Sequence, residues 1–149
     1  MPVEIIRLTT EGASLLDAVE EDVFDNDIDP DALAAFLADP RHVMLIAVDG
    51  DDGRGARVVG MASAFDYFHP DKKPQMFINE VGVAPAWRRR GLGRRLVAAL
   101  LAEAKARGCV YAWLGTDADN VGGKACFGSV SGGEAPQPFL LYEWSLEGD

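Results

Sequence analysis

Five arginines and two glycines stand close together in the middle of the chain, and these residue types can hold phosphate. Residues 76–95 read MFINEVGVAPAWRRRGLGRR, and five of the 14 basic residues fall within positions 88–95. Arginine offers a fork of N–H donors to phosphate oxygens. Gly91 and Gly93 lack a Cβ, so the backbone can bend there and approach a ligand. The cluster predicts a phosphate site in a chain of net charge −10; the alternative is a solvated, arginine-rich turn.

The elements around this cluster strengthen the prediction. An apolar run from Met76 to Val83 is typical of a strand, and it stops at Ala84-Pro85. A helix is expected from about Gly91, with an apolar stripe formed by Leu92, Leu96, Val97, Leu100, Leu101 and Ala104. The first N–H groups of a helix have no partner within the helix, and the helix dipole places partial positive charge there. A strand, a glycine turn and a helix start together favour bound phosphate.

The same residues carry a resemblance to a known family. Arg88-Arg89-Arg90-Gly91-Leu92-Gly93, after the strand Ile78–Val83, resembles the R/Q-x-x-G-x-G/A motif of the GNAT N-acetyltransferases. The resemblance extends from about Val3 to Leu146. Through Phe68-His69-Pro70, Ile78–Val83 and Asp117–Asn120, the chain looks most like the aminoglycoside 3-N-acetyltransferases of the gentamicin type.

This resemblance implies acetyl-CoA as co-substrate and a set of contacts with it. In the family, the arginine-glycine loop wraps the pyrophosphate, and the pantetheine arm lies between two splayed parallel strands. The residues implied are Val81, Gly82, Val83, Arg88, Arg89, Arg90, Gly91, Leu92, Gly93, Arg94, Asn120 and Phe127. Gly82, inside a strand, also fits a close approach by a ligand or a bulge. Many members carry a tyrosine, proposed to protonate the thiolate, where this chain has Phe127, which has no proton to donate. Water or a hydroxyl of Tyr111, Tyr142 or Ser129 would then have to serve.

Glu80 is the candidate catalytic base. It is a carboxylate within an otherwise apolar strand, a position that costs free energy unless the group is paired or functional. An amine can attack a thioester only as the neutral base, so N-acetylation needs a proton acceptor. The resemblance implies a carboxylate at this point of the strand. An outward-facing glutamate on a half-exposed strand is the alternative.

Acidic residues elsewhere could bind a cationic acceptor. Eight carboxylates and no lysine or arginine lie between Asp17 and Asp31, which is either a solvated face or a surface that steers cations. The predicted acceptor contacts are Glu80, Asp117, Asp119, Asp25, Asp66 and Tyr67, with Glu134 and Glu143 as weaker candidates. Asp119 could instead cap a helix that begins near Asn120.

Composition excludes several other classes. A net charge of −10 disfavours nucleic acid and anionic membranes as partners. Two cysteines and two histidines without close spacing predict neither a disulfide framework nor a metal site. Neither a spanning apolar run nor a signal segment is recognisable, so we expect a cytoplasmic protein. A homodimer formed through the last predicted strand is compatible with the family resemblance.

The pattern of elements predicts one α/β domain over residues 1–149. Its sheet is expected to be mixed and mostly antiparallel, with helices on both faces and a parallel, right-handed strand–helix–strand unit from Met76 to Leu114. The strands expected are 3–8, 43–48, 58–67, 75–83, 110–114 and 139–146. The helices expected are 13–19, one starting at Asp29-Pro30, one from about Gly91 to Gly108, and 120–127. Loops are expected at 49–55, 68–74 and 129–138.

The leading hypothesis is therefore acetyl transfer from acetyl-CoA to a small polycationic amine, best an aminoglycoside acetylated on its 3-amine. A polyamine, an amino acid or a protein amine is the alternative acceptor. A CoA-binding module without turnover is the alternative of a different class, and Phe127 is the residue that favours it.

Overall fold

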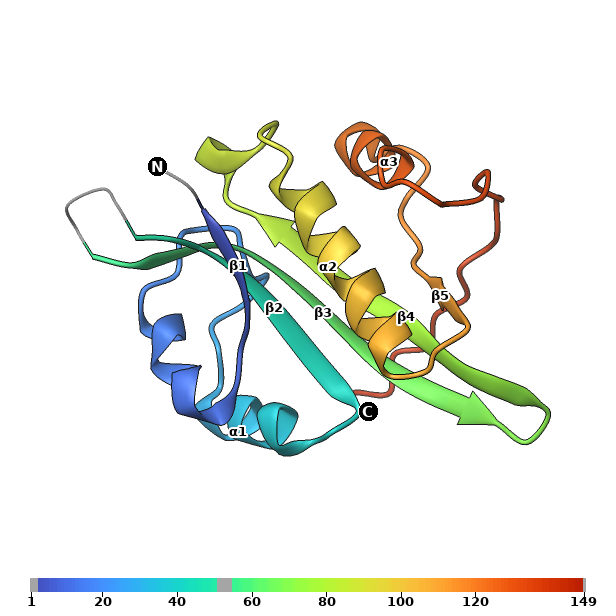
Figure 1. Ribbon diagram of the computed structural model, residues 1–149, viewed down its shortest axis with the longest axis horizontal. Coiled ribbons are helices and arrows are strands. Elements are labelled where there is room, and N and C mark those ends of the chain that lie inside the picture. Colours follow the sequence, from blue (N-terminus) through green and yellow to red (C-terminus); the bar gives the residue numbers. More distant parts are fainter. Residues whose placement is uncertain (1–2, 51–54, 149) are drawn as a thin grey trace.

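The protein is built around one five-stranded sheet whose strands follow one another in chain order (Figure 1). The computed structural model describes residues 3–50 and 55–148. Strands β1 to β4 are antiparallel neighbours, whereas β4 and β5 run parallel, which confirms the predicted mixed sheet. The strands are β1 (Glu4–Arg7), β2 (His42–Asp49), β3 (Arg57–His69), β4 (Lys72–Val83) and β5 (Tyr111–Trp113).

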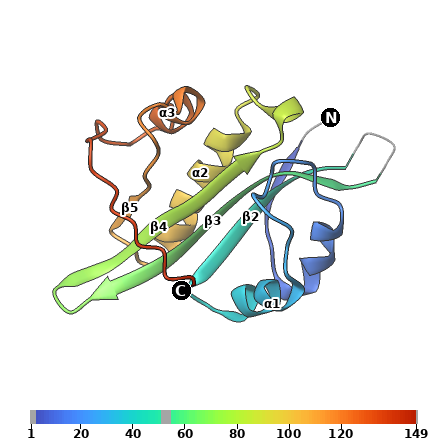
Figure 2. The ribbon, with the colours of Figure 1, turned by 180° about the vertical axis from the view of Figure 1, so that it is seen from behind.

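Helices cover both faces of the sheet (Figures 1 and 2). Helix α2 (Leu92–Ala106) packs its predicted apolar stripe on one face, where Leu96 and Leu100 are fully buried among β2, β3 and β4. The 3₁₀ helix η1 (Thr10–Asp17) and helix α1 (Pro30–Ala38) cover part of the other face. The short 3₁₀ helix η2 (Pro85–Trp87) precedes α2, and α3 (Val121–Gly128) packs beside it.

Local signals read from the sequence explain where these helices begin and end. Asp29 caps α1 by accepting a hydrogen bond from the Asp31 N–H at 3.0 Å, and Pro30 occupies the first helical position. Gly108 lies just beyond the end of α2 with φ of 84°, a left-handed conformation that favours glycine. Both predictions are confirmed.

Two predicted boundaries differ from the structure. The helix expected over 13–19 is a 3₁₀ helix over Thr10–Asp17, because Val19 instead forms a parallel bridge with Val58. The loop expected over 68–74 shrinks to two residues, since β3 and β4 continue as a long hairpin with His69 opposite Lys72. The loop expected over 49–55 lies largely outside the described residues.

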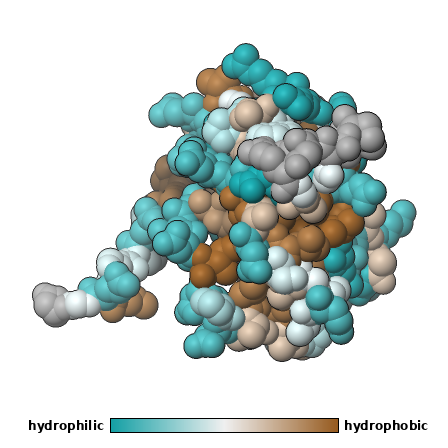
Figure 3. All heavy atoms as spheres, turned by 90° about the vertical axis from the view of Figure 1, so that its left-hand side faces the viewer, coloured by the Kyte–Doolittle hydropathy of each residue, from teal (hydrophilic) through white to brown (hydrophobic). Residues whose placement is uncertain are grey.

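The last predicted strand, 139–146, is absent: this segment has no strand structure in the part of the chain that the structure describes. Its large side chains remain exposed. Figure 3 shows the last of the described residues standing clear of the body. A strand needs a neighbour to receive its backbone hydrogen bonds, and among the described residues the segment pairs with no strand.

No helix in the described residues has the length and apolar character needed to cross a membrane.

Candidate active site

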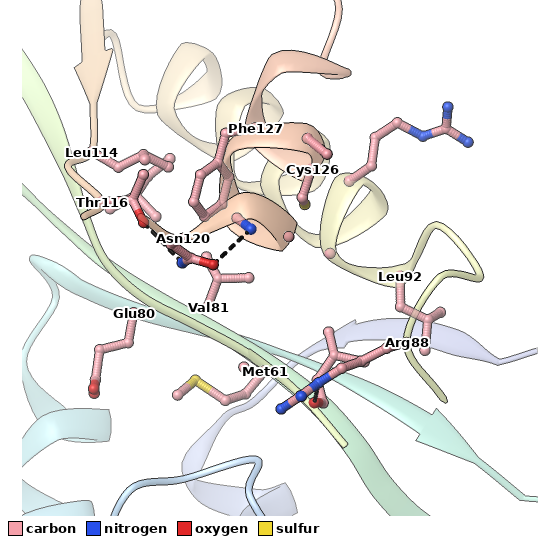
Figure 4. Close-up of a pocket in the computed structure, with 18 of the residues that line it drawn as sticks. Met61, Glu80, Val81, Arg88, Leu92, Leu114, Thr116, Asn120, Cys126 and Phe127 are labelled. Atoms are coloured by element: carbon pink, nitrogen blue, oxygen red, sulfur yellow. Dashed lines mark hydrogen bonds between the residues drawn. The ribbon is translucent and has the colours of Figure 1, made fainter. Parts of the chain in front are cut away.

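A cavity of about 1250 Å³ opens where β4 and β5 separate (Figure 4). The two strands pair only from Gln75↔Tyr111 to Phe77↔Trp113. Beyond that point, residues 78–83 form one wall of the cavity and residues 114–116 the opposite wall, while the start of α2 and one side of α3 close its ends. The strand–helix–strand unit predicted from the sequence therefore produces a gap at the carboxyl ends of its strands, where ligands of parallel sheets bind.

A β-bulge places Glu80 at this gap. Ser63 on β3 pairs with Glu80, but the next residue, Ala64, pairs with Ile78, so Asn79 is the extra residue on β4. Ile78 is buried against α2, and after the bulge Val81 again faces that side. Figure 4 shows Glu80 and Val81 pointing to opposite sides of β4. Bulges of this kind re-aim side chains next to active sites.

Glu80 is paired with a second carboxyl group. Desolvation raises the pKa of Glu80, and a hydrogen bond and charge repulsion from Asp25 raise it further. Both residues line the large cavity, and both also line a second cavity of about 260 Å³ under α1. The Asp25–Glu80 pair therefore lies where the two cavities meet.

The smaller cavity has an apolar floor and an acidic rim. Its floor includes Phe24, Leu33 and Phe36, and its rim carries Asp27 and Asp29 besides the Asp25–Glu80 pair. These aspartates belong to the acidic segment 17–31 noted in the sequence. Part of that segment therefore lines a cavity, although nothing in the sequence alone showed which of its carboxylates would do so.

Gly82 is required by the chain itself. The backbone carbonyl of Val23 occupies the space that a Cβ at position 82 would need. The close approach expected at Gly82 is thus made by the segment that contains Val23, which is itself 2% exposed. This contact also brings Asp25, two residues further along, to Glu80, two residues earlier on β4.

The arginine-glycine loop has the backbone geometry that a bound anion requires. Gly91 is the N-cap of α2 with φ of 79°, and its position offers no side-chain cap for the helix. The first intrahelical bond here is donated by the Arg95 N–H to the Gly91 carbonyl at 3.0 Å. The N–H groups of residues 92–94 precede it, so they have no helical acceptor. A positive end of the helix dipole therefore faces the cavity.

The arginines of the loop do not share one role. Arg88, Arg89 and Arg94 line the cavity, and the Arg88 Nε–H donates to the carbonyl of Val83 at 2.9 Å. Arg90 instead lies over the ring of Trp87, at 5.9 Å from its centroid. Arg95, which was not predicted to contact the cofactor, donates to the carbonyl of Val3. Of the predicted cofactor contacts, Arg90 alone is absent from the cavity wall.

Gly93 also has a structural reason that the sequence did not reveal. A Cβ there would lie 2.8 Å from the Cys126 Sγ, so its absence lets α3 pack on α2. Burial raises the pKa of the Cys126 thiol, and Arg94 opposes this shift only in part. Cys126 lines the cavity. Because a thiol held protonated is a poor nucleophile, we assign Cys126 to the cavity wall and not to the chemistry.

Asn120 holds the start of α3. Its Oδ1 accepts from the Gly123 N–H at 2.9 Å, while its Nδ2 donates to the Thr116 Oγ at 2.9 Å. Asn120, and not Asp119, is therefore the N-cap. Thr116 and Phe127 line the cavity with it (Figure 4). Thr116 and Cys126 are cavity residues that sequence reasoning missed, because neither belongs to a recognisable motif.

Among the hydroxyl groups considered in place of a tyrosine at position 127, only that of Ser129 lines the cavity. The Ser129 hydroxyl is engaged, since it donates to the Cys126 carbonyl at 2.6 Å. Tyr111 and Tyr142 are exposed outside the cavity. Thr116 accepts from Asn120, which leaves its own proton available to another acceptor.

Several predicted acceptor contacts lie elsewhere. Asp117 and Asp119 are exposed and line neither cavity. Asp66 faces Arg107 at 3.7 Å near the far end of α2. Tyr67 accepts a hydrogen bond from Trp113 Nε1 at 2.7 Å and donates to Gln75. Glu134 and Glu143 are exposed on the C-terminal segment.

The described residues contain no group of three or more histidine, cysteine, aspartate or glutamate side chains placed to hold a metal ion.

Comparison with known proteins agrees with this geometry. The profile of the acetyltransferase (GNAT) family matches residues 12–132. A search of curated protein sequences finds no match. Among solved structures, the fold resembles an aminoglycoside acetyltransferase, meta-AAC0020, from an uncultured soil metagenomic sample, in complex with sisomicin. The TM-score is 0.76 with 17% identity over 97% of each chain.

Two other solved structures have the same fold. One is AAC(6')-Iy in complex with the bisubstrate analogue CoA-S-monomethyl-acetylneamine, with a TM-score of 0.73 and 18% identity over 97% of this chain and 100% of that one. The other is a transcriptional regulator from Bacillus halodurans C-125, with a TM-score of 0.70 and 22% identity over 96% and 100%. The family profile covers most of the chain, and the chain therefore belongs to the GNAT family of acetyltransferases.

Proposed function

We propose that this protein transfers the acetyl group of acetyl-CoA to a primary amine of a small polycationic acceptor, with an aminoglycoside as that acceptor. The observation that carries the proposal is the position of Glu80. It lies where a large cavity bordered by arginines meets a smaller cavity bordered by carboxylates. A phosphate-bearing donor and a cationic acceptor would meet at this carboxyl group.

The large cavity suits acetyl-CoA. Unpaired N–H groups at the start of α2, with Arg88, Arg89 and Arg94, supply donors for a pyrophosphate. In the described residues, no strand pairs with the edge of β4 that faces β5 from 81 to 83, and apart from the Val83 carbonyl, which Arg88 engages, its backbone groups can bond to the amides of a pantetheine arm. The acetyl thioester would then lie near Glu80, with Asn120 and Phe127 on the opposite wall.

Glu80 would act as the base that removes a proton from the acceptor's ammonium group. Its raised pKa makes it a stronger proton acceptor than an ordinary carboxylate, because basicity rises with pKa. The amine nitrogen then bonds to the acetyl carbon while the carbon–sulfur bond breaks. The departing sulfur needs a hydrogen-bond donor, and Thr116 has a free O–H at the cavity wall for this purpose.

The small cavity suits the acceptor. Asp25, Asp27 and Asp29 would pair with ammonium groups, while Phe24 and Phe36 pack against the apolar faces of a sugar ring. Attraction between opposite charges weakens as salt screens it. We therefore expect the KM of the acceptor to rise with ionic strength, in addition to any effect on acetyl-CoA.

The position acetylated is a finer part of the proposal. The motifs quoted above favour the 3-amine of an aminoglycoside, whereas one structural neighbour bears the 6′ designation in its name. The orientation of the sugar relative to Glu80 would decide between them. NMR of the product distinguishes the two positions directly.

The test is thiol release from acetyl-CoA with gentamicin, sisomicin, kanamycin, spermidine, lysine and a basic peptide as acceptors. Turnover confined to the aminoglycosides supports the whole proposal. Fast turnover with spermidine, lysine or the peptide would support the proposed acetyltransferase activity but contradict the proposal that the acceptor is an aminoglycoside. Glu80→Gln should lower kcat at least ~10-fold with whichever acceptor is used, while acetyl-CoA binding, measured by calorimetry, stays unchanged.

A CoA-binding module without turnover is the second candidate, and Phe127 is the observation that favours it. The phenyl ring lines the cavity at the place where many members of the family carry a tyrosine. Tight acetyl-CoA binding with no thiol release across the panel would establish this second function.

A further inference from the structure

Residues 18–25, which we call the crossing segment, lead from η1 to the carboxyl group of Glu80. Asp25 in this segment lines both cavities, and Asp22 lines the large one. The segment belongs to none of the helices and strands of the described chain, so no regular backbone ladder fixes its whole path. The positions of its carboxylates therefore depend on the few contacts that it makes with the sheet.

Backbone hydrogen bonds hold the beginning of the crossing segment on β3. The Val58 N–H donates to the Ala18 carbonyl at 2.8 Å, and the Glu20 N–H donates to the Val58 carbonyl at 2.9 Å. Val19 thereby forms a parallel bridge with Val58, which is fully buried. A contact made by so few backbone bonds opens easily unless other groups support it.

An ion pair between side chains reinforces this contact. The Arg57 guanidinium donates through both Nε, at 2.9 Å, and Nη2 to the Glu20 Oε2. The side chains of Arg57 and Glu20 are only 26% and 18% exposed. Charge-assisted hydrogen bonds are about twice as strong as neutral ones, and partial burial reduces their screening by salt. Because Arg57 precedes Val58 on β3, the ion pair and the backbone bonds hold the same part of the crossing segment.

The crossing segment is held a second time where it passes over β4. There the Val23 carbonyl fills the space beside Gly82, and Val23 itself is buried. Two residues separate Glu20 from Val23, and one of them, Asp22, has a φ of 64°, a left-handed conformation that is uncommon for residues other than glycine. A stretch this short and constrained has little freedom to absorb a displacement at Glu20. Such a displacement would therefore move the carboxylate two residues beyond Val23.

We propose that Arg57 is a positioning residue for the acetyl transfer: its ion pair with Glu20 holds the crossing segment so that Asp25 lies against Glu80. Arg57 itself lines neither cavity, so it acts without contacting either substrate. The inference rests on the proposed function for the identity of the substrates, and it adds that the acceptor site depends on a contact outside both cavities. The groups proposed to bind the pyrophosphate lie at the start of α2 and in the loop before it, so acetyl-CoA binding should not depend on Arg57.

A second ion pair in the same sheet provides the matched control. Arg7 on β1 pairs with Glu103 on α2, with 3.1 Å between the Arg7 Nη1 and the Glu103 Oε1. This pair also joins a strand to another part of the chain, but its residues line neither cavity and contact no part of the crossing segment. Arg7→Met and Arg57→Met each remove one guanidinium from an ion pair and keep an unbranched apolar side chain.

Steady-state kinetics and calorimetry of the full chain test the effect on each substrate. Arg57→Met should raise the KM of the acceptor at least ~5-fold, while the Kd of acetyl-CoA stays within about twofold of the wild type. Arg7→Met should leave both constants unchanged. If Arg57 acts through Asp25, adding Arg57→Met to the variant Asp25→Asn should change the acceptor KM by less than about twofold, because effects that act through one group are not additive.

Titration of the Glu80 carboxyl group, followed by NMR of the carboxyl carbons in the free protein, tests the same contact without turnover. The hydrogen bond and the charge of Asp25 help to raise the pKa of Glu80, so this pKa should fall in Arg57→Met and stay unchanged in Arg7→Met. Arg57→Lys keeps the cation but loses the paired donors, so it should show smaller changes in the same direction, and it takes the place of Arg57→Met if that variant does not fold.

The two readouts separate this proposal from the proposed function. A wild type that acetylates none of the acceptors would reject the proposed function, and the Glu80 titration would still decide whether Arg57 positions Asp25. A Glu80 pKa that is the same in Arg57→Met and Arg57→Lys as in the wild type would overturn the proposal. An acceptor KM that rises no more in these two variants than in Arg7→Met would overturn it as well.

Discussion

The backbone carbonyl of Val23 lies in the space that a Cβ on Gly82 would occupy, so the chain before α1 crosses β4 in direct contact with it. This crossing brings Asp25 and Glu80 together. Gly82→Ala should therefore displace the segment around Val23, lowering the free energy of unfolding by ~1–3 kcal/mol and the kcat together. Urea denaturation and steady-state kinetics measure the two effects.

Gly128→Ala is the control for that change, since a Cβ at Gly128 meets nothing within 4 Å and its φ is not positive. It should leave stability within ~1 kcal/mol of the wild type. If Gly82→Ala were as stable and as active as Gly128→Ala, the contact with Val23 would have no role in placing Asp25.

The Asp25–Glu80 pair predicts a particular pH dependence of activity. The pKa of Glu80 is raised from its ordinary value of 4.5, so activity should fall with acid at a pH above 4.5. Asp25→Asn removes the charge repulsion but not the desolvation, which is the largest cause. The acid limb of kcat/KM should then move to lower pH without returning fully to 4.5. An acid limb that does not move in Asp25→Asn would show that another group controls it.

The same raised pKa predicts how Glu80 affects stability. The folded state binds the proton more tightly than the unfolded state, so stability falls as pH rises from about 4.5 through the folded pKa. Glu80→Gln cannot lose a proton and should be more stable than the wild type at pH 7, with the gain vanishing at low pH. Thermal unfolding at pH 4 and pH 7 measures this, while kcat of the variant at pH 7 should fall at least ~10-fold.

Two adjacent arginines on α2 allow the phosphate site to be tested with an internal control. Arg94 lines the large cavity, whereas Arg95 points away from it and donates to the Val3 carbonyl at 2.7 Å. Arg94→Gln should raise the KM of acetyl-CoA by ~10-fold, because a charge-assisted hydrogen bond contributes roughly 1.5–3 kcal/mol. Arg95→Gln should leave this KM unchanged and cost up to ~1.5 kcal/mol of stability. Equal effects of both variants on KM would indicate general electrostatic attraction and no specific contact.

The parts of this fold that sequence reasoning predicted depend on local chemistry. The strand before Pro85, the glycine turn at Gly91 and the stop at Gly108 are each set by residues close in the chain. The parallel pairing of β4 with β5 followed because a helix connects them.

The parts that were missed depend on contacts between distant residues. Gly82 and Gly93 were expected to let a ligand approach the backbone. In the structure, the space beside Gly82 is filled by the Val23 carbonyl and the space beside Gly93 by the Cys126 Sγ. The apolar segment 139–146 was predicted to be a strand, yet its sequence cannot show whether a partner strand exists within the same chain. The bulge at Asn79, which aims Glu80, appears only once β3 and β4 are paired.

The two neighbouring glycines of α3 should respond to substitution in opposite directions. At Gly123 the Asn120 side-chain amide occupies the space that a Cβ would need, because that side chain folds back to cap the helix. Gly122 has no atom near its missing Cβ. Gly122→Ala should therefore stabilise α3 by up to ~1 kcal/mol through helix propensity, while Gly123→Ala should displace the cap and cost ~1 kcal/mol or more. Hydrogen exchange of the α3 amides measures both directly. Because Asn120 also bonds to Thr116 at the cavity wall, Gly123→Ala should in addition raise the KM of acetyl-CoA. Equal exchange protection of the α3 amides in the two variants would contradict the assignment of Asn120 as the N-cap.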